Sequence, residues 1–189
     1  MDETTSLVRD GAPTVSKITL LVTITALLLV LTAGMAVAQN ITGTNKADRL
    51  EGTANADVLV GRGGEDQLFG KSGADTLRGG SQNDDLFGQK GPDTLVGGSG
   101  ADFLGGNEGA DRLTGNTGRD TLEGRGGDDD LFASGDGQRD QVKCGDGTDT
   151  AKVDLNDVVD DQLVSSVVAL PGGVVSILSC ETVTVGILE

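Results

Sequence analysis

The sequence contains no histidine, no tryptophan and no tyrosine, and it has only four phenylalanines in 189 residues. Histidine is the commonest general base and the commonest transition-metal ligand, so its absence removes the usual basis for either role. The shortage of large aromatic side chains also argues against a conventional globular core for a chain of this length. The chain is therefore either poorly ordered or built from small repeated units that need no bulky core.

Positive charge is also scarce, because 14 Lys and Arg residues face 30 Asp and Glu residues and leave a formal net charge of −16. Like charges repel, so this balance disfavours nucleic acid and anionic membrane surfaces as partners. It favours cations instead. The available donors are carboxylate and carbonyl oxygens, which are the ligands of calcium and magnesium.

One long apolar run lies near the N-terminus, from Ile18 to Ala33, and a small-x-small cleavage pattern follows at residues 36–38. These features predict a signal peptide over residues 1–38 and a secreted, extracellular chain. The alternative is an uncleaved membrane anchor, since residues 18–38 are just long enough to span a bilayer. Both interpretations place the rest of the chain outside the cytoplasm.

A nine-residue repeat runs from Gly43 to Phe132 with no insertion over ninety residues. Position one is always glycine: Gly43, Gly52, Gly61, Gly70, Gly79, Gly88, Gly97, Gly106, Gly115 and Gly124. Position six is always aspartate: Asp48, Asp57, Asp66, Asp75, Asp84, Asp93, Asp102, Asp111, Asp120 and Asp129. Position eight is always leucine, and position four is glycine in seven of the ten repeats. Constant columns at one period indicate a repeat structure.

The columns predict an all-β solenoid. Positions one to six are expected to form a turn, because glycine allows positive φ and Asn107 and Asn116 at position two tolerate it. Positions seven to nine are expected to form a very short strand with leucine facing inward. Two repeats then make one coil of eighteen residues, and the aspartates line two edges. One edge carries Asp48, Asp66, Asp84, Asp102 and Asp120, and the other carries Asp57, Asp75, Asp93, Asp111 and Asp129.

The two rows of aspartates predict a requirement for a divalent cation. Stacked coils lie about 5 Å apart. Two ionised carboxylates at that spacing repel by about 3 kcal/mol at an effective dielectric near 20. A divalent cation between successive turns would reverse the sign of this interaction and use the turn carbonyls as well. The chain is therefore expected to need metal to fold.

The repeats resemble the RTX, or haemolysin-type, calcium-binding nonapeptide GGxGxDxLx. Residues Gly97 to Leu104 match it in full, and the repeats that begin at Gly70, Gly106 and Gly115 match it except at position two. The resemblance implies a right-handed parallel β-roll that binds up to about eight Ca²⁺ ions between same-side turns. It implies that the ions are held by the ten position-six aspartates and by loop carbonyls. The implied glycine positions are Gly61, Gly70, Gly79, Gly88, Gly97, Gly100, Gly106, Gly109, Gly115 and Gly118.

Some repeats depart from this pattern. Lys46, Asn55 and Gln82 replace the position-four glycine, so weaker binding is expected in the first coil and in the middle of one edge. Phe69 and Phe87 at position nine fall one coil apart, and we expect them to pack between coils rather than to form a site.

The period slips after Phe132. Residues 133–143 form an eleven-residue variant that keeps Asp140, and a repeat-like turn then leads to Asp149; the two aspartates either extend the metal edges or lie outside them. The acids further on, Asp154, Asp157, Asp160 and Asp161, are expected to be exposed loop residues. Residues 163–170 and 174–178 are rich in valine and leucine and predict two strands around a tight turn.

Cys144 and Cys180 are the only cysteines. In an exported chain an even count indicates one disulfide, which would close a loop of roughly 37 residues and stabilise the fold by about 4 kcal/mol in the entropy model. A reactive thiol or soft-metal site is the alternative, but it lacks a histidine partner. This region resembles the closing unit of some secreted bacterial repeat proteins, which implies a disulfide-linked β cap over residues 144–189.

The sequence thus predicts three parts: the signal peptide at 1–38, the β-roll at 39–143 and the cap at 144–189. The favoured function is non-enzymatic binding of extracellular calcium coupled to folding, with no nucleic-acid or small-molecule partner. An enzyme is the first alternative, but the chain has no Gly-x-Ser-x-Gly or zincin motif. A calcium-stiffened surface adhesion or spacer module, held at a membrane by the uncleaved N-terminal segment, is the second.

Overall fold

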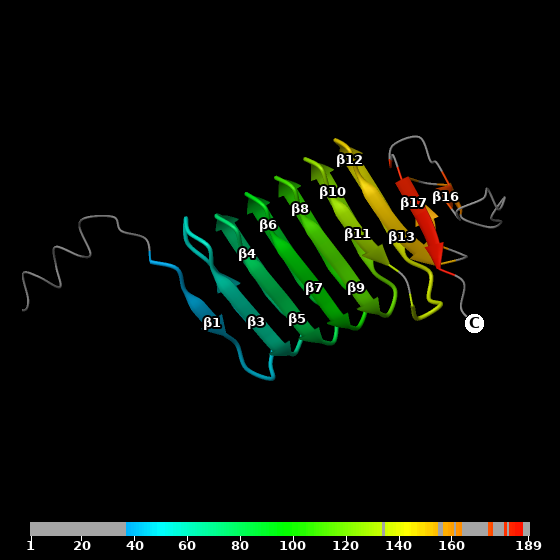
Figure 1. Ribbon diagram of the computed structural model, residues 1–189. Helices are drawn as coiled ribbons and strands as arrows, with labels where there is room; N and C mark the ends of the chain where they lie inside the picture. The colour runs from blue at the N-terminus through cyan, green and yellow to red at the C-terminus, as the bar shows by residue number, and fades with distance from the viewer. Residues whose placement is uncertain are drawn as a thin grey trace, which may run out of the picture. The chain divides into compact units, whose positions relative to one another are not determined.

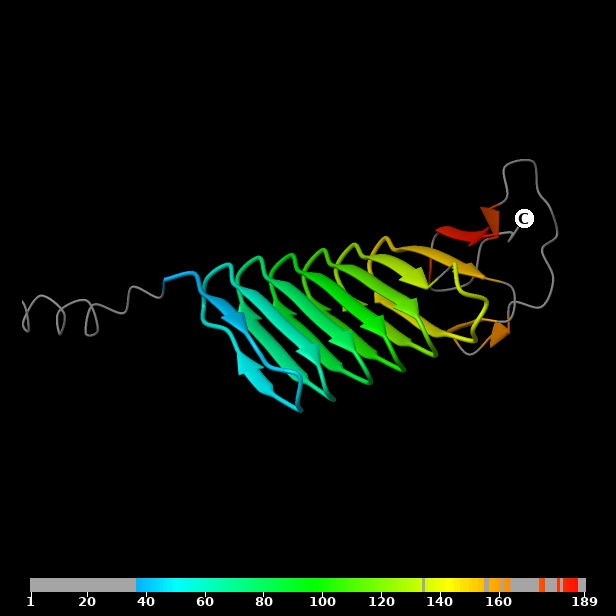
Figure 2. The same ribbon diagram turned by 90° about the horizontal axis from the view of Figure 1, so that it is seen from below.

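The computed structural model describes residues 37–133, 135–154, 157–160, 162–163, 174–175, 180 and 182–186. Strands and turns make up these residues, and they form two sheets that face each other (Figures 1 and 2). No helix in this part of the chain is long and apolar enough to cross a membrane. The predicted signal peptide lies outside the described residues except for its last two.

From β1 to β14, successive strands alternate between the two sheets, because the chain crosses from one sheet to the other at every turn. The first sheet contains, in spatial order, β1 (Asn40–Thr42), β3 (Val58–Gly63), β5 (Thr76–Ser81), β7 (Thr94–Ser99), β9 (Arg112–Thr117), β11 (Asp130–Ala133), β13 (Thr150–Asp154), β17 (Thr182–Gly186) and β16 (Val174–Val175). The second contains β2 (Arg49–Glu51), β4 (Gln67–Ser72), β6 (Asp85–Lys90), β8 (Phe103–Glu108), β10 (Thr121–Gly126), β12 (Gln141–Asp146), β14 (Val158–Val159) and β15 (Gln162–Leu163). This is a parallel β-roll, as the repeat predicts.

The register repeats every eighteen residues. Leu59 pairs with Leu77, and Leu77 pairs with Leu95, so each leucine stacks on the equivalent leucine of the next coil. These leucines are fully buried between the sheets. Val142 and Ala151 continue the same ladders where the leucines end. The core is therefore two columns of aliphatic side chains, which explains how the chain folds with almost no aromatic residues.

The strands are longer than the sequence predicts. β3 to β10 each have six residues and run from position seven of one repeat to position three of the next, so only positions four to six form the turn. Position two has positive φ in the repeats from Gly61 to Gly124, for example 85° at Arg62. This left-handed residue within the strand lets the chain bend while positions two and three still pair with the neighbouring coil.

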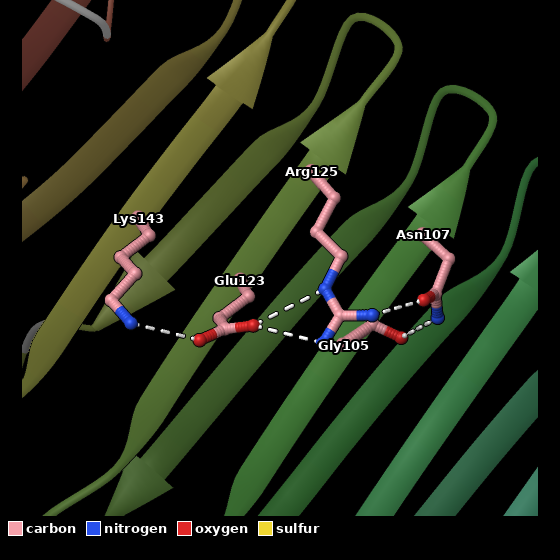
Figure 3. A network of polar contacts seen from close by, with 5 residues as sticks. All are labelled: Gly105, Asn107, Glu123, Arg125 and Lys143. Atoms are coloured by element: carbon pink, nitrogen blue, oxygen red, sulfur yellow. Dashed lines mark hydrogen bonds and ion pairs between the residues drawn. The ribbon is translucent and has the colours of Figure 1, made fainter.

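Side chains on the outer faces also join the coils. Phe69 and Phe87 stack with ring centroids 5.2 Å apart, which confirms the predicted packing between coils. Figure 3 shows a polar network across three strands of the second sheet. Glu123 binds Arg125 and Lys143 at 3.0 Å each, and Arg125 reaches Asn107 on the adjacent strand. These exposed contacts support the stack, although each exposed ion pair contributes little stability.

The C-terminal strands end the parallel order. β14 pairs with β15 in antiparallel fashion, and β16 pairs with β17 in the same way. The two strands predicted around a tight turn, at residues 163–170 and 174–178, lie outside the described residues except for 163, 174 and 175, and these three residues belong to β15 and β16 in different sheets. Cys144 in β12 and Cys180 form a disulfide with Cα atoms 5.4 Å apart, and both residues are fully buried.

Candidate metal centre

The aspartates at position six form two continuous files, one along each edge of the roll. The backbone N–H of each aspartate donates to the Oδ1 of the next aspartate in its file, at 2.7 to 3.0 Å. The first file contains Asp48, Asp66, Asp84, Asp102, Asp120, Asp140 and Asp157. The second file contains Asp57, Asp75, Asp93, Asp111, Asp129 and Asp149. All of them except Asp48 are at most 2% exposed.

The second carboxylate oxygen behaves differently from the first. In nine aspartates the Oδ2 atom is buried and has no hydrogen-bond partner among the described residues: Asp66, Asp75, Asp84, Asp93, Asp102, Asp111, Asp120, Asp129 and Asp140. A buried polar atom without a partner is costly, and a charged one costs more. Native proteins rarely leave such groups unsatisfied, so a regular series of them indicates a ligand.

The position-one glycine lies beside each of these oxygens. A Cβ atom added at Gly79 would overlap the Oδ2 of Asp84 and lie 2.8 Å from the carbonyl oxygen of Gly97 in the next same-side turn. Gly79 does not have positive φ, so the glycine is required for space rather than for backbone conformation. The carboxylate and the carbonyl of the neighbouring turn therefore share a small space that any side chain would fill.

The position-four glycines place further carbonyls in the gap between turns. A Cβ atom added at Gly109 or Gly127 would overlap the carbonyl oxygen of Gly91 or Gly109, respectively, in the preceding same-side turn. The N–H of Gly91 donates to Glu108 and that of Gly109 to Gly126, at 2.8 and 2.9 Å. Their carbonyl oxygens accept no hydrogen bond in the described part of the chain. Each gap therefore presents both carboxylate and carbonyl oxygens.

Burial raises the pKa of these nine carboxyls with an unpartnered Oδ2 atom, because a low-dielectric environment disfavours the charged form. The hydrogen bond from the backbone N–H lowers the pKa in part, and the neighbouring carboxylates of the file raise it again in several cases. The pKa rises to about 6 for Asp84 and Asp120, to about 7 for Asp93, Asp102 and Asp129, and to about 8 for Asp140. Near neutral pH, Asp93, Asp102, Asp129 and Asp140 therefore hold protons for part of the time unless a cation replaces them.

These donors fit a calcium ion. Calcium takes six to eight oxygen ligands from carboxylates and backbone carbonyls in flexible geometry. The gaps offer oxygen donors of both kinds, and the unpartnered Oδ2 atoms need a positive charge. Magnesium prefers a strict octahedron with several waters, which a row of fixed backbone carbonyls suits less well.

A model of the RTX calcium-binding nonapeptide repeat family matches the chain four times, at residues 42–77, 69–104, 78–113 and 105–142. Together these matches cover residues 42–142, which is more than half of the chain. The chain belongs to the RTX repeat family. RTX repeats bind calcium, so calcium is the partner that family membership supports. No curated protein and no solved structure matches the chain.

The predicted RTX site residues are not all in the same environment. Eight of the ten predicted aspartates, Asp66 to Asp129, have a free Oδ2 atom beside a position-one glycine. Asp48 and Asp57 do not, because Thr44 and Thr53 hydrogen-bond their Oδ2 atoms. The backbone and side-chain hydrogen bonds from Thr44 lower the pKa of Asp48, in the opposite direction to the interior aspartates.

Gln82 does not disturb its RTX turn. It adopts a φ of 76°, which is positive like the φ of the position-four glycines in the other interior repeats, and Asp84 in the same repeat keeps its free Oδ2 atom. Lys46 and Asn55 do not have positive φ, and their turns are the ones closed by threonine. The geometry thus separates the three departures from the RTX pattern into two kinds.

Two acids predicted to be exposed loop residues are buried instead. Asp154 is 3% exposed, and its Oδ2 accepts the N–H groups of Gly135 and Gly137. Asp157 is fully buried and ends the first file, with Oδ1 bonded to Asp140 N–H and Oδ2 to Asp154 N–H. The sequence 157–159 repeats the acid-x-aliphatic pattern of positions six to eight, which could have identified it. Asp160 is half-buried, and Asp161 lies outside the described residues.

Proposed function

We propose that this RTX chain is a secreted, non-enzymatic calcium-binding protein whose coils stack stably only when calcium lies between successive turns. The observation that carries the proposal is the series of nine buried, unpartnered Oδ2 atoms at an eighteen-residue period. A hydrogen-bonding or purely structural role would leave these oxygens with partners.

The proposed ligands of each ion come from two neighbouring same-side turns. One turn supplies the position-six carboxylate and the position-four carbonyl oxygen, and the next same-side turn supplies the position-one carbonyl oxygen. In the gap that follows Asp84, for example, the Oδ2 of Asp84 and the carbonyl of Gly97 lie around the same space. Bound calcium would supply the positive charge that lets adjacent carboxylates remain ionised while buried.

The coupling to folding follows from the cost of the files without metal. Each coil buries two aliphatic core residues but also two carboxylates, and the carboxylates oppose burial. Calcium binds the folded stack but not the dispersed chain, so it stabilises the fold by mass action. Extracellular calcium modules bind with dissociation constants of about 10⁻⁴ to 10⁻³ M, a range that would keep the roll unfolded until it leaves the cell.

A calcium titration of the full chain tests this proposal. Far-UV circular dichroism in a chelator should show a largely unfolded chain, and millimolar calcium should restore a β spectrum. Magnesium at the same concentration is the control and should have a much smaller effect. A spectrum that is the same in chelator and in calcium would contradict the proposal.

The proposed route of export has its own test. The mass of the chain recovered from the medium should correspond to residues 39–189, whose first residue is Gln39. Recovery of the intact chain with the membrane fraction would instead support the anchored surface module. Within the proposed closing unit, residues 144–189, the disulfide joins β12 to the segment before β17. We propose that it holds the last strands against the end of the stack.

A further inference from the structure

The first two turns of the roll differ from all later ones at the carboxylate. The Oδ2 atom of Asp48 accepts the Thr44 N–H at 2.6 Å and the Thr44 hydroxyl at 2.8 Å. The Oδ2 atom of Asp57 accepts the same two groups of Thr53, at 2.5 and 2.9 Å. Asp57 is 1% exposed, so its environment is as buried as that of the interior aspartates. Asp57 differs from the interior aspartates in that its Oδ2 atom has hydrogen-bond partners, whereas theirs have none.

The cause lies in the side chain at position two. In the eight repeats that begin at Gly61 to Gly124, the residue at position two has positive φ. Six of these eight residues are not glycine. These are Arg62, Lys71, Gln89, Asn107, Asn116 and Arg125, with φ from 73° to 85°. Thr44 and Thr53 do not have positive φ. A β-branched side chain makes that conformation costly, so threonine keeps the backbone in the ordinary region and its N–H bonds the carboxylate.

The threonine hydroxyl completes a closed turn. It donates to the carboxylate and accepts the N–H of position four, from Lys46 and from Asn55 at 3.2 Å. Position four therefore needs no positive φ in these turns, which explains why both lack the glycine found in most other repeats. The departures at positions two and four belong to one alternative turn structure rather than being two separate defects.

We propose that Thr44 and Thr53 take the place of the metal ion, so that the first two turns bind no calcium and the files of ions begin at Asp66 and Asp75. This inference rests on the proposed calcium binding and assigns which turns take part in it. The first file is closed in a similar way at its other end, where both oxygens of Asp157 accept backbone N–H groups. The first two turns are thus a metal-independent cap on the roll.

Counting bound ions in the full chain by native mass spectrometry at saturating calcium tests the inference. Asp57→Asn should bind as many ions as the wild type. Asp93→Asn is the matched variant, since Asp93 lies in the same file and has a free Oδ2 atom. It should bind at least one ion fewer. The double variant Thr53→Gly/Asn55→Gly removes the closed turn and should bind one ion more.

The outcomes separate this inference from the function on which it depends. If the wild type binds no calcium, the proposed function is wrong and the inference falls with it. If the wild type binds calcium but Asp57→Asn loses an ion, the function stands and the cap is wrong. The same conclusion follows if the double variant folds in calcium, as its circular dichroism would show, yet gains no ion.

Discussion

Two glycine-to-alanine substitutions test whether the proposed calcium site needs the space beside the aspartate Oδ2 atom. One replaces a glycine that borders this space, and the other replaces a glycine that does not. Gly97 at position one and Gly126 at position three both lie in strands and lack positive φ, so alanine strains the backbone at neither. A Cβ at Gly97 would overlap the Oδ2 of Asp102 and lie 3.0 Å from its Cβ and Cγ atoms. A Cβ at Gly126 would meet only the carbonyl oxygen of Asn107, at 3.6 Å.

The expected effects have opposite signs. Alanine reduces the entropy of the unfolded chain, which stabilises a compatible site by about 0.4 to 1 kcal/mol, so Gly126→Ala should be neutral to slightly stabilising. Gly97→Ala gains the same term but loses about 1 to 3 kcal/mol to overpacking, and it also fills the space beside the carboxylate. We therefore expect Gly97→Ala to be destabilised by up to about 2 kcal/mol before any loss of calcium is counted.

Thermal unfolding of the full chain in calcium, together with a count of bound ions, measures both effects. Gly97→Ala should melt at a lower temperature and bind at least one ion fewer, whereas Gly126→Ala should match the wild type in ion count. If Gly97→Ala retains every ion, the space between the position-one glycine and the carboxylate is not where calcium binds. That result would overturn the assignment of the site.

Three further predictions follow from the files and the disulfide. Asp93→Asn should destabilise the calcium-loaded roll in chemical denaturation, yet raise the small folded fraction that circular dichroism detects in chelator at pH 8, because it removes a repulsion of about 3 kcal/mol per ionised neighbour; the same sign in both conditions would show a purely structural residue. Six interior carboxyls, those of Asp84, Asp93, Asp102, Asp120, Asp129 and Asp140, have pKa values raised to about 6 to 8, so their contribution to calcium-free stability is full below about pH 4 and is lost as pH rises through 6 to 8; the folded fraction that circular dichroism detects in calcium-depleted buffer should therefore rise with falling pH, and an opposite trend would contradict the burial of these groups. Reduction of the Cys144–Cys180 disulfide should lower the free energy of unfolding in calcium by about 4 kcal/mol in the entropy model, as chemical denaturation would measure. In the same assay, Glu123→Gln on the outer face should lower it by less than about 1 kcal/mol.

The coil length and the core could be predicted because their determinants are side chains in constant columns. Leucine at position eight recurs every nine residues, and this period allows only one inward-facing ladder on each sheet. Strand length was missed because positions one to three consist largely of glycine and polar residues, which show no alternation of apolar side chains. Their pairing depends on backbone conformation at position two, which the apolar pattern does not reveal.

The files of aspartates were predicted through Asp129, where the nine-residue period holds. Asp157 was missed because it follows Asp140 by seventeen residues rather than eighteen, after an insertion had already broken the period. The closed turns at Thr44 and Thr53 were missed for a different reason. The sequence pattern pointed to position four, where Lys46 and Asn55 replace glycine. The residue that closes each turn is instead the threonine two positions earlier, whose hydroxyl accepts the N–H of position four.

The same backbone feature serves both the sheet pairing and the proposed metal sites. Positive φ at position two keeps positions two and three paired in the sheet, as in β3 with β5, and it accompanies a free Oδ2 on the carboxylate of the same repeat. The residue types that reach this conformation here are glycine, which has no Cβ, and asparagine, glutamine, arginine and lysine, which differ in charge and size but all have an unbranched Cβ. What the repeat requires at position two is therefore the exclusion of β-branching. Because threonine occupies that position only at Thr44 and Thr53 in the ten repeats, one residue type marks where the chain changes from the proposed capping turns to the proposed metal-binding turns.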